Sequence, residues 1–163
     1  MGNARGVVYI DTMIVLEAHR ANCWASLTGR YDIRTVPKVV EEALRGRGHN
    51  AGFVPVEAST FERRVNVVEF PYPKLLEVVL EHEQLSFLDD GEKELLAYLA
   101  HPEREGEVYN VCTADKAAIR VACELGLKYA LVSLEDLLRT TKPRPSLKGQ
   151  YSRDFFQQRG RNT

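Results

Sequence analysis

The sequence predicts an α/β protein in which helices cover a central parallel sheet. Two features of the 163-residue chain support this prediction. Short apolar segments alternate with segments in which apolar residues recur at helical spacing. The short segments, such as VVYI at residues 7–10, are apolar throughout rather than at every second position. Continuous apolar character is typical of strands that are buried on both faces of a parallel sheet.

Each predicted strand is followed by a predicted helix, with turn residues between them. The strand segments are rich in β-branched and aromatic residues, and the helical segments have one apolar face. The predicted strands span residues 7–10, 31–36, 65–70, 108–112 and 129–132, with a further short strand or insertion at 53–56. The first predicted helix follows Asp11-Thr12 and ends near Gly29, and the others span residues 38–45, 75–83, 88–100, 113–126 and 133–138.

Local signals support several of these helix boundaries. Pro37 suits the first turn of a helix, because its φ is already helical and its missing N–H would have no partner there. Asp90 is expected to cap the helix that follows it. Ser133 is expected to cap the last helix, with Asp136 three residues further on. Gly126 suits the end of the helix before it.

The composition indicates one globular domain. Lys and Arg number 22 and Asp and Glu number 23, so the formal net charge is −1, and 44% of the residues are hydrophobic. Three cysteines without a CxxC pair disfavour a disulfide framework or a zinc site. No apolar segment approaches the roughly 20 residues that span a bilayer, and residues 1–11 lack the apolar core of a secretory signal. We therefore expect a cytoplasmic protein with no membrane contact.

Charge is distributed unevenly along the chain. Residues 142–163 contain six basic residues and one acidic residue, a net charge of +5. Residues 1–141 contain 16 basic and 22 acidic residues, a net charge of −6. We therefore divide the chain into a body, residues 1–141, and a basic C-terminal tail, residues 142–163. The tail is expected either to be solvated or to contact phosphate groups.

Acidic residues occur where two of the predicted strands end. Asp11 directly follows the first strand, and Asp115 follows the fourth, after Thr113. The carboxyl ends of parallel strands meet at one edge of a sheet, where α/β proteins bind ligands, so these two carboxylates are expected to lie close together. Further acids lie at the helices that follow other strands: Glu41, Glu42, Asp89, Asp90, Glu92 and Glu94.

Carboxylates gathered in this way repel one another unless protons or cations neutralise them. Oxygen ligands with few imidazoles or thiolates favour Mg²⁺ or Mn²⁺ over zinc, and these ions activate water for attack on phosphodiesters. Each acid taken alone has a simpler interpretation, as a helix cap or as part of a solvated helix face. Two acids at strand ends, together with two further acidic segments, favour a metal site.

Four segments resemble, in this order, the motif blocks of the PIN domain family: VYIDTMIVL, VPKVVEEAL, LDDGEKELLAYLA and NVCTADKAAIRVA. The resemblance covers about residues 7–138. It implies a three-layer α/β/α sandwich with a central parallel sheet. It also implies a nuclease that cleaves mostly single-stranded RNA with Mg²⁺ or Mn²⁺. Many members of the family are toxins of toxin–antitoxin pairs, and members often dimerise.

The resemblance also assigns residues to the site. The four family acids match Asp11, Glu42, Glu92 and Asp115. Of these, Asp11, Glu92 and Asp115 would bind the metal, with Glu42 acting directly or through water. Glu41 stays an alternative to Glu42, and Glu94 to Glu92. Many members have aspartate at the third position, where this chain has glutamate.

Contacts with RNA are expected from hydroxyl and basic side chains around the acids, namely Thr12, Thr113, Lys116 and Arg45. The resemblance thus predicts a Mg²⁺- or Mn²⁺-dependent endoribonuclease whose partners are RNA, an antitoxin protein and a second copy of the chain. Its role as a toxin stays open. The alternative is a non-catalytic RNA-binding or scaffold module on the same fold.

Overall fold

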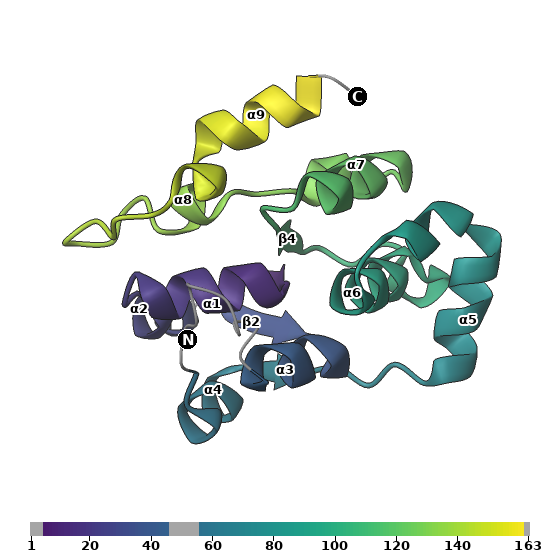
Figure 1. Ribbon diagram of the computed structural model, residues 1–163, viewed down its shortest axis with the longest axis horizontal. Coiled ribbons are helices and arrows are strands. Elements are labelled where there is room, and N and C mark those ends of the chain that lie inside the picture. Colours follow the sequence, from purple (N-terminus) through teal and green to yellow (C-terminus); the bar gives the residue numbers. More distant parts are fainter. Residues whose placement is uncertain (1–4, 46–55, 162–163) are drawn as a thin grey trace.

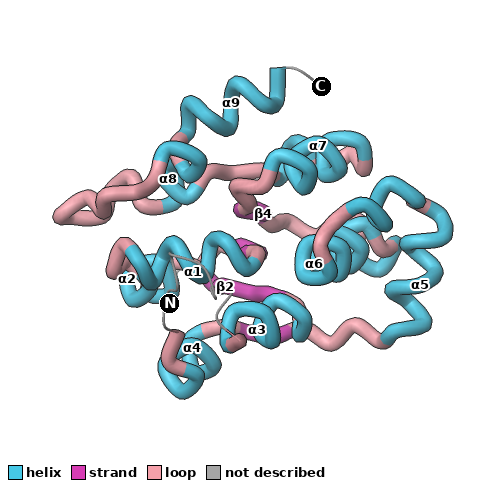
Figure 2. The backbone as a smooth tube through the Cα atoms, viewed as in Figure 1, coloured by secondary structure: helices cyan, strands magenta, loops and turns pink. Residues whose placement is uncertain are grey.

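The computed structural model describes residues 5–45 and 56–161. Within these ranges a four-stranded sheet lies in the middle of the molecule and is flanked by helices (Figures 1 and 2). All of its strand pairs are parallel. This arrangement confirms the predicted α/β class and is consistent with a three-layer α/β/α sandwich. No helix in the described part of the chain is long and apolar enough to cross a membrane.

Strands and helices alternate along the chain as expected. The strands are β1 (Val7–Ile10), β2 (Asp32–Thr35), β3 (Asn66–Val67) and β4 (Asn110–Cys112). The α-helices are α1 (Thr12–Arg20), α2 (Trp24–Arg30), α3 (Pro37–Leu44), α4 (Ala58–Arg64), α5 (Tyr72–Glu81), α6 (Asp90–Ala100), α7 (Lys116–Glu124), α8 (Leu134–Leu137) and α9 (Arg153–Arg161). Short 3₁₀ helices are η1 (Glu83–Phe87), η2 (Pro102–Arg104), η3 (Lys128–Ala130) and η4 (Gly149–Tyr151).

The strand order β3-β2-β1-β4 determines where a ligand site can form. After β1 the chain adds β2 and β3 on one side, and it then crosses to the other side of β1 to form β4. The winding therefore reverses between β1 and β4, and open α/β sheets bind ligands at the carboxyl ends of such strands. Ile10 lies opposite Cys112 in this pair. Asp11 and Thr113 consequently leave the sheet side by side.

The core is continuous across the sheet. Val8, Tyr9 and Ile10 of β1 are at most 1% exposed, which explains why this strand is apolar throughout rather than at alternate positions. The ring of Tyr9 packs against those of Tyr98 and Tyr109, with centroid distances of 5.7 and 5.5 Å. Such aromatic pairs add to the stabilisation that burial alone supplies.

Helix caps predicted from local signals are mostly confirmed. Pro37 is the first residue of α3, and the hydroxyl of Ser133 accepts the N–H of Asp136 at 3.1 Å. The N-cap of α6 is Asp89 rather than Asp90, which was predicted. Asp90 is therefore the first helical residue, where an acidic side chain still interacts favourably with the helix dipole.

Two predicted boundaries differ because of turns. The helix expected to run to Gly29 is broken into α1 and α2, since Asn22 has a φ of 53°, a left-handed conformation that ends a helix and that asparagine tolerates. The fifth strand expected at 129–132 is absent from the described residues. Positions 128–130 form η3, and only Leu131 bridges to Val111 before α8 begins.

The third strand is shorter than predicted, and one predicted strand cannot be assessed. Of the residues expected at 65–70, only Asn66 and Val67 pair with β2. The short strand or insertion predicted at 53–56 lies outside the described residues except for Val56, which is not in a strand.

The segment after Thr141 packs against the body, which differs from the appended tail that we expected. A buried carboxylate, that of Glu17 on α1, accepts the backbone N–H of Lys148 at 2.7 Å. The same carboxylate forms an ion pair with Arg20, whose guanidinium donates to the carbonyl of Ser146 at 2.9 Å. This packing could not be predicted from the sequence, because the C-terminal segment makes these contacts through its backbone N–H and C=O groups.

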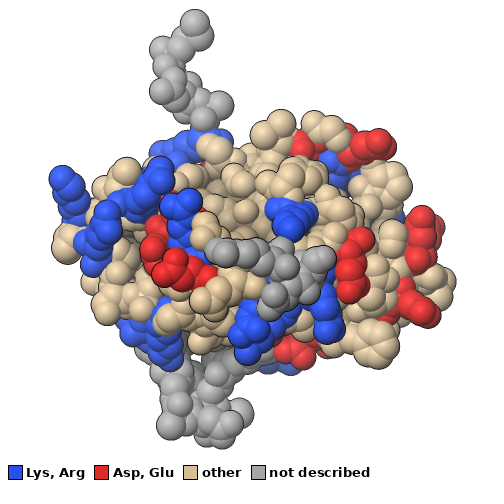
Figure 3. Space-filling model, turned by 90° about the horizontal axis from the view of Figure 1, so that it is seen from above, with Lys and Arg blue, Asp and Glu red and all other residues tan. Residues whose placement is uncertain are grey.

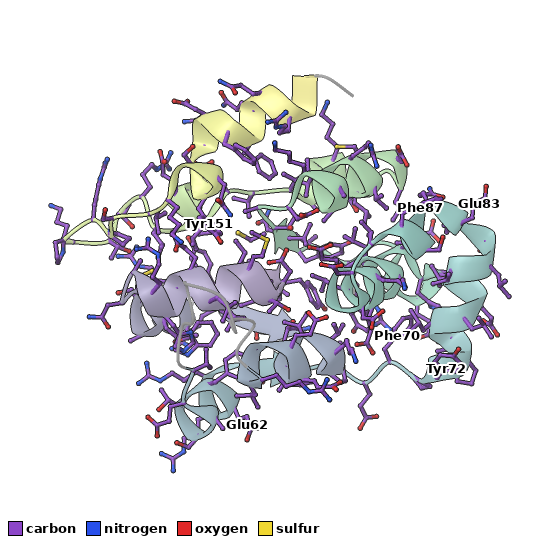
Figure 4. The ribbon with its side chains drawn as sticks, in the orientation of Figure 1. Glu62, Phe70, Tyr72, Glu83, Phe87 and Tyr151 are labelled. Carbon is purple, nitrogen blue, oxygen red and sulfur yellow. The ribbon has the colours of Figure 1, made fainter. Side chains whose placement is uncertain are left out.

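The C-terminal segment is anchored at a second point. Tyr151 is 6% exposed and lies between this segment and α1 (Figure 4), where its hydroxyl donates to the carbonyl of Met13 at 3.4 Å. Helix α9 then packs near α7 and α8. Figure 3 views the molecule from the α9 side, and Lys and Arg predominate on the left-hand part of this face.

We expect Glu17→Ala to destabilise the protein by about 2 kcal/mol, because it leaves the Lys148 N–H and the Arg20 guanidinium without their charged acceptor. Urea unfolding measures this loss, and hydrogen exchange should show reduced protection across residues 142–161. Glu41→Ala is the control, since its solvent-exposed ion pairs with Lys38 and Arg45 contribute little to stability. Unchanged exchange in the C-terminal segment of Glu17→Ala would show that Glu17 does not hold it.

Candidate metal centre

Asp11 stands between β1 and α1 and is 1% exposed. It is the N-cap of α1, and its Oδ1 accepts the N–H of Ile14 at 3.1 Å. Its Oδ2 accepts the hydroxyl of Thr113. Capping explains why an aspartate suits this position. Capping alone does not require that the carboxylate be buried beside a second strand end.

Thr113 joins Asp11 to the second strand-end acid. Its hydroxyl donates to Asp11 and accepts the backbone N–H of Asp115 at 3.3 Å. Asp115 caps α7 in the same manner, with Oδ1 accepting the N–H of Ala118 at 2.9 Å. A carboxylate oxygen can accept more than one bond, so these cap bonds leave acceptor positions on both acids.

Glu42 reaches the same edge from α3. Its Oε2 accepts the hydroxyl of Thr12 at 2.7 Å, and its Oε1 accepts the backbone N–H of Gly91 at 3.1 Å. The carboxylate therefore ties together the first residue of α1, the middle of α3 and the first turn of α6. Thr12 directly follows Asp11, which places the Glu42 carboxylate next to the strand-end pair.

The neighbouring Glu41 faces away from this edge. It forms ion pairs with Lys38 and Arg45, and its side chain is 40% exposed. The Lys38 hydrogen bond and the charge of Arg45 hold its pKa below the usual value. Of the two glutamates that the sequence left as alternatives, Glu42 is the one that the fold brings to the acidic edge.

Gly91 belongs to this arrangement, although the sequence did not single it out. A Cβ built on Gly91 would clash with Oε2 of Glu42, and it would lie 3.1 Å from Cδ of Glu42 and 3.3 Å from the Thr12 hydroxyl. Only glycine leaves room for the carboxylate here. Glycine disfavours helices by about 1 kcal/mol relative to alanine. Its presence in the first turn of α6 was therefore the one sequence signal that a neighbouring group approaches the backbone closely at this position.

The acids of α6 are placed differently from one another. Glu92 is 9% exposed and follows Gly91 directly in the first turn. Glu94 lies one half-turn further on, and its Oε2 accepts the N–H of Lys38 at 2.8 Å. Val36, the N-cap of α3, provides no capping side chain. The carboxylate of Glu94 on α6 instead accepts a free backbone N–H at this helix end. Burial raises the pKa of Glu94.

The carboxylates at this edge interact electrostatically, as the pKa of Asp11 indicates. Burial raises the pKa of Asp11 from 3.8 to about 6. The hydrogen bonds from Thr113 and Ile14 oppose this rise, and the negative charges of Asp115 and Glu42 add to it. A nearby cation would stabilise the charged form of such an acid. Perturbed acids also cluster at functional sites.

The donor set suits Mg²⁺ or Mn²⁺, because it consists of carboxylate and hydroxyl oxygens. Within residues 5–45 and 56–161, however, no group of three His, Cys, Asp or Glu side chains lies in a geometry that could hold a metal ion. Magnesium commonly binds through one or two carboxylates and keeps several waters. Asp11 and Asp115 supply two carboxylates of the kind that such an ion uses.

One of the two basic residues predicted to contact RNA, Lys116, lies at this edge, whereas Arg45 lies at the far end of α3. Lys116 is the first residue of α7, directly after Asp115, and is exposed. Arg45 follows α3, and its exposed side chain pairs with Glu41. Thr12 and Thr113, predicted as further RNA contacts, instead direct their hydroxyls to Glu42 and Asp11.

Comparison with known proteins found no family model that matches this chain. It also found no significant match to a curated protein.

Proposed function

We propose that this protein is a Mg²⁺- or Mn²⁺-dependent nuclease that hydrolyses phosphodiester bonds of RNA. The observation that carries the proposal is the buried carboxylate of Asp11, joined through Thr113 to Asp115 at the point where the sheet reverses its winding. The charge of Glu42 acts on the same carboxylate. The charged form of Asp11 is buried and has the negative charges of Asp115 and Glu42 nearby, which costs stability, and binding a cation is a function that accounts for this cost.

Asp11 and Asp115 would hold the ion in this proposal, with waters and a substrate phosphate completing its ligands. When bound, the ion would activate water and neutralise charge on the phosphate. Glu42 lies beside the pair, where its carboxylate would orient a water molecule or accept a proton. Thr113 fixes the orientation of Asp11, and Thr12 fixes that of Glu42. Glu92, the third acid that the resemblance assigns to the site, is buried in the first turn of α6.

The choice of RNA as substrate rests on the resemblance of four segments to PIN domains and on one basic group beside the acids. Lys116 directly follows Asp115 and is exposed, where it would contact a phosphate next to the bond to be cleaved. Such contacts make binding depend on salt concentration but not on base sequence.

The alternative is an RNA-binding or scaffold module without catalysis. It is favoured by one observation, that no three potential ligands converge in the described residues. The two functions predict different effects of Mg²⁺ or Mn²⁺ on the melting temperature of the protein.

We expect Mn²⁺ or Mg²⁺ to raise the melting temperature of the wild type, because an ion that binds only the folded state stabilises it by mass action. At a free ion concentration 100 times the Kd, the gain is about 2.7 kcal/mol. The double variant Asp11→Asn/Asp115→Asn should show no such shift, whereas Glu41→Gln should respond as the wild type does. A wild type that ignores both metals would favour the non-catalytic module.

A further inference from the structure

A second charged region lies at the other edge of the sheet. Val7, Asp32 and Asn66 begin β1, β2 and β3, and all three line one hollow of about 760 Å³. Its remaining lining comes from the ends of α2 and α4 and from the residues next to β1 and β2. We call this region the arginine hollow, and its charged lining consists of Arg5, Asp32, Arg34, Arg63 and Arg64.

The arginine hollow is separate from the acidic edge. Asp11 follows the last residue of β1, whereas Val7 is its first residue. Four residues at about 3.3 Å each separate the two edges by roughly 13 Å along the strand. The α/β rule that places ligands at carboxyl ends of strands does not predict a hollow here, so its charge needs another explanation.

The charge of the hollow is strongly positive. Four arginines line it against one aspartate among the described lining residues, an excess of three positive charges. Asp32 is engaged by Arg34, which donates two hydrogen bonds to it at 2.7 and 3.1 Å, and by Asn66 at 2.6 Å. The remaining arginines are therefore not neutralised by Asp32.

The partial negative charges at two helix ends offset only part of this excess positive charge. Helices α2 and α4 end at this edge, and each carboxyl end has a partial charge of about −0.5. Together they offset about one of the three positive charges. In the part of the chain that the structure describes, neither Arg63 nor Arg64 forms an ion pair. Roughly two positive charges thus remain for an anion.

Shape and chemistry together narrow the class of anion. Arginine forks match phosphate oxygens in geometry and charge. The volume lies within the range of about 300 to 1,000 Å³ that holds small ligands. Val7 and Tyr31 are half-buried and line the same hollow, and they offer apolar surface to a flat group such as a base. The hydroxyl of Tyr31 donates to the carbonyl of Leu137 at 2.8 Å, which fixes the position of this ring.

We propose that the arginine hollow binds a phosphate-bearing small molecule of mononucleotide size, held through its phosphate by Arg5, Arg63 and Arg64. This site is independent of the acidic edge and of the nuclease activity proposed for it. Phosphate supplies the affinity, and the apolar wall receives the rest of the ligand.

Calorimetric titrations of the full chain with AMP, pyrophosphate and adenosine test this proposal. They are made without added divalent ions, so that the acidic edge takes no part. We expect AMP and pyrophosphate to bind and adenosine not to bind. Arg63→Gln/Arg64→Gln should weaken AMP binding at least about tenfold, since each lost charged hydrogen bond is worth about a factor of ten. Arg5→Gln, which lies outside the helices, should weaken it as well.

Matched variants separate this site from general charge effects and from the acidic edge. Arg120 and Arg139 are exposed and do not line the hollow, so Arg120→Gln/Arg139→Gln should bind AMP as the wild type does. Asp11→Asn should also bind AMP normally, whether or not the nuclease proposal holds. The proposal is overturned if no phosphate probe binds, if adenosine binds as well as AMP, or if the control loses affinity equally. A single-stranded RNA without terminal phosphate that displaces AMP and binds more tightly would assign the hollow to RNA instead.

Discussion

Asp11→Asn is expected to lower RNA cleavage by at least about 100-fold and, in metal-free buffer at neutral pH, to make the protein more stable. Groups that only support a metal ligand already contribute about 10- to 100-fold, so a direct ligand should contribute at least that much. Asparagine keeps an oxygen that can accept the N–H of Ile14, and therefore the cap of α1 survives. Loss of activity together with a gain in stability is the signature of a functional rather than a structural acid.

The pH dependence of that gain follows from the pKa of Asp11. Its pKa is about 6 in the folded protein and 3.8 as the ordinary value, so the folded state binds the proton more tightly than the unfolded state. Stability is then lost as the pH rises from about 4 to 6. Above pH 6 the full cost applies, about 3 kcal/mol for a difference of about two pKa units. The variant lacks this cost, so its advantage should appear above pH 6 and vanish below pH 4.

Urea unfolding at pH 4 and pH 7.5 measures this difference, and cleavage of a labelled single-stranded RNA measures activity. Glu41→Gln is the matched control, because Glu41 is acidic, adjacent to Glu42 and turned away from the acidic edge. It should leave activity unchanged and, because Lys38 and Arg45 hold the pKa of Glu41 below its usual value, it should gain no stability at pH 7.5. Cleavage by Asp11→Asn at the wild-type rate would refute the assigned metal ligand. A loss of stability at pH 7.5 would refute the cost of burying the charged Asp11 carboxylate.

Gly91→Ala is expected to displace Glu42 and to lower cleavage at least about tenfold without unfolding the chain. The added Cβ would clash with Oε2 of Glu42, and a glutamate carboxylate can swing away because it ends a flexible side chain. The movement would break the hydrogen bonds from Thr12 and Gly91. Each bond to a charged group is worth about 1.5–3 kcal/mol, whereas alanine favours the helix by about 1 kcal/mol. The net result should be a destabilisation of about 2–5 kcal/mol.

Gly29 provides the comparison for this variant. It also lies in a helix, α2, and a Cβ there would meet no atom within 4 Å. Gly29→Ala should therefore stabilise the protein by about 0.5–1 kcal/mol through helix propensity, the opposite sign to Gly91→Ala.

A double-mutant cycle identifies the cause. Once Glu42→Ala has removed the carboxylate, Gly91→Ala should become stabilising in urea unfolding, as Gly29→Ala is. A destabilisation of equal size in both backgrounds would show that Gly91 is required for a reason other than Glu42.

The fold class and the two strand-end acids were predictable from sequence because both depend on short-range patterns. Continuous apolar segments specify buried strands, and an aspartate between a strand and a helix is placed at the carboxyl edge by connectivity alone. The fifth strand was not predictable in this way, because a turn at 128–130 left only Leu131 to pair. The break at Asn22 depends on one left-handed residue, which periodicity does not detect.

Only the tertiary structure distinguished residues that look alike in sequence. Glu41 and Glu42 are adjacent and chemically identical, and packing of α3 against α1 and α6 turns Glu42 towards Thr12 and Gly91. Glu17 holds a segment more than 125 residues away, and the arginine hollow gathers side chains from four separate parts of the chain. Sequence by itself determined the α/β class and the positions of Asp11 and Asp115 at the ends of two neighbouring strands. The tertiary structure decided which other groups reach them, because contacts between distant segments depend on how helices pack and not on local spacing.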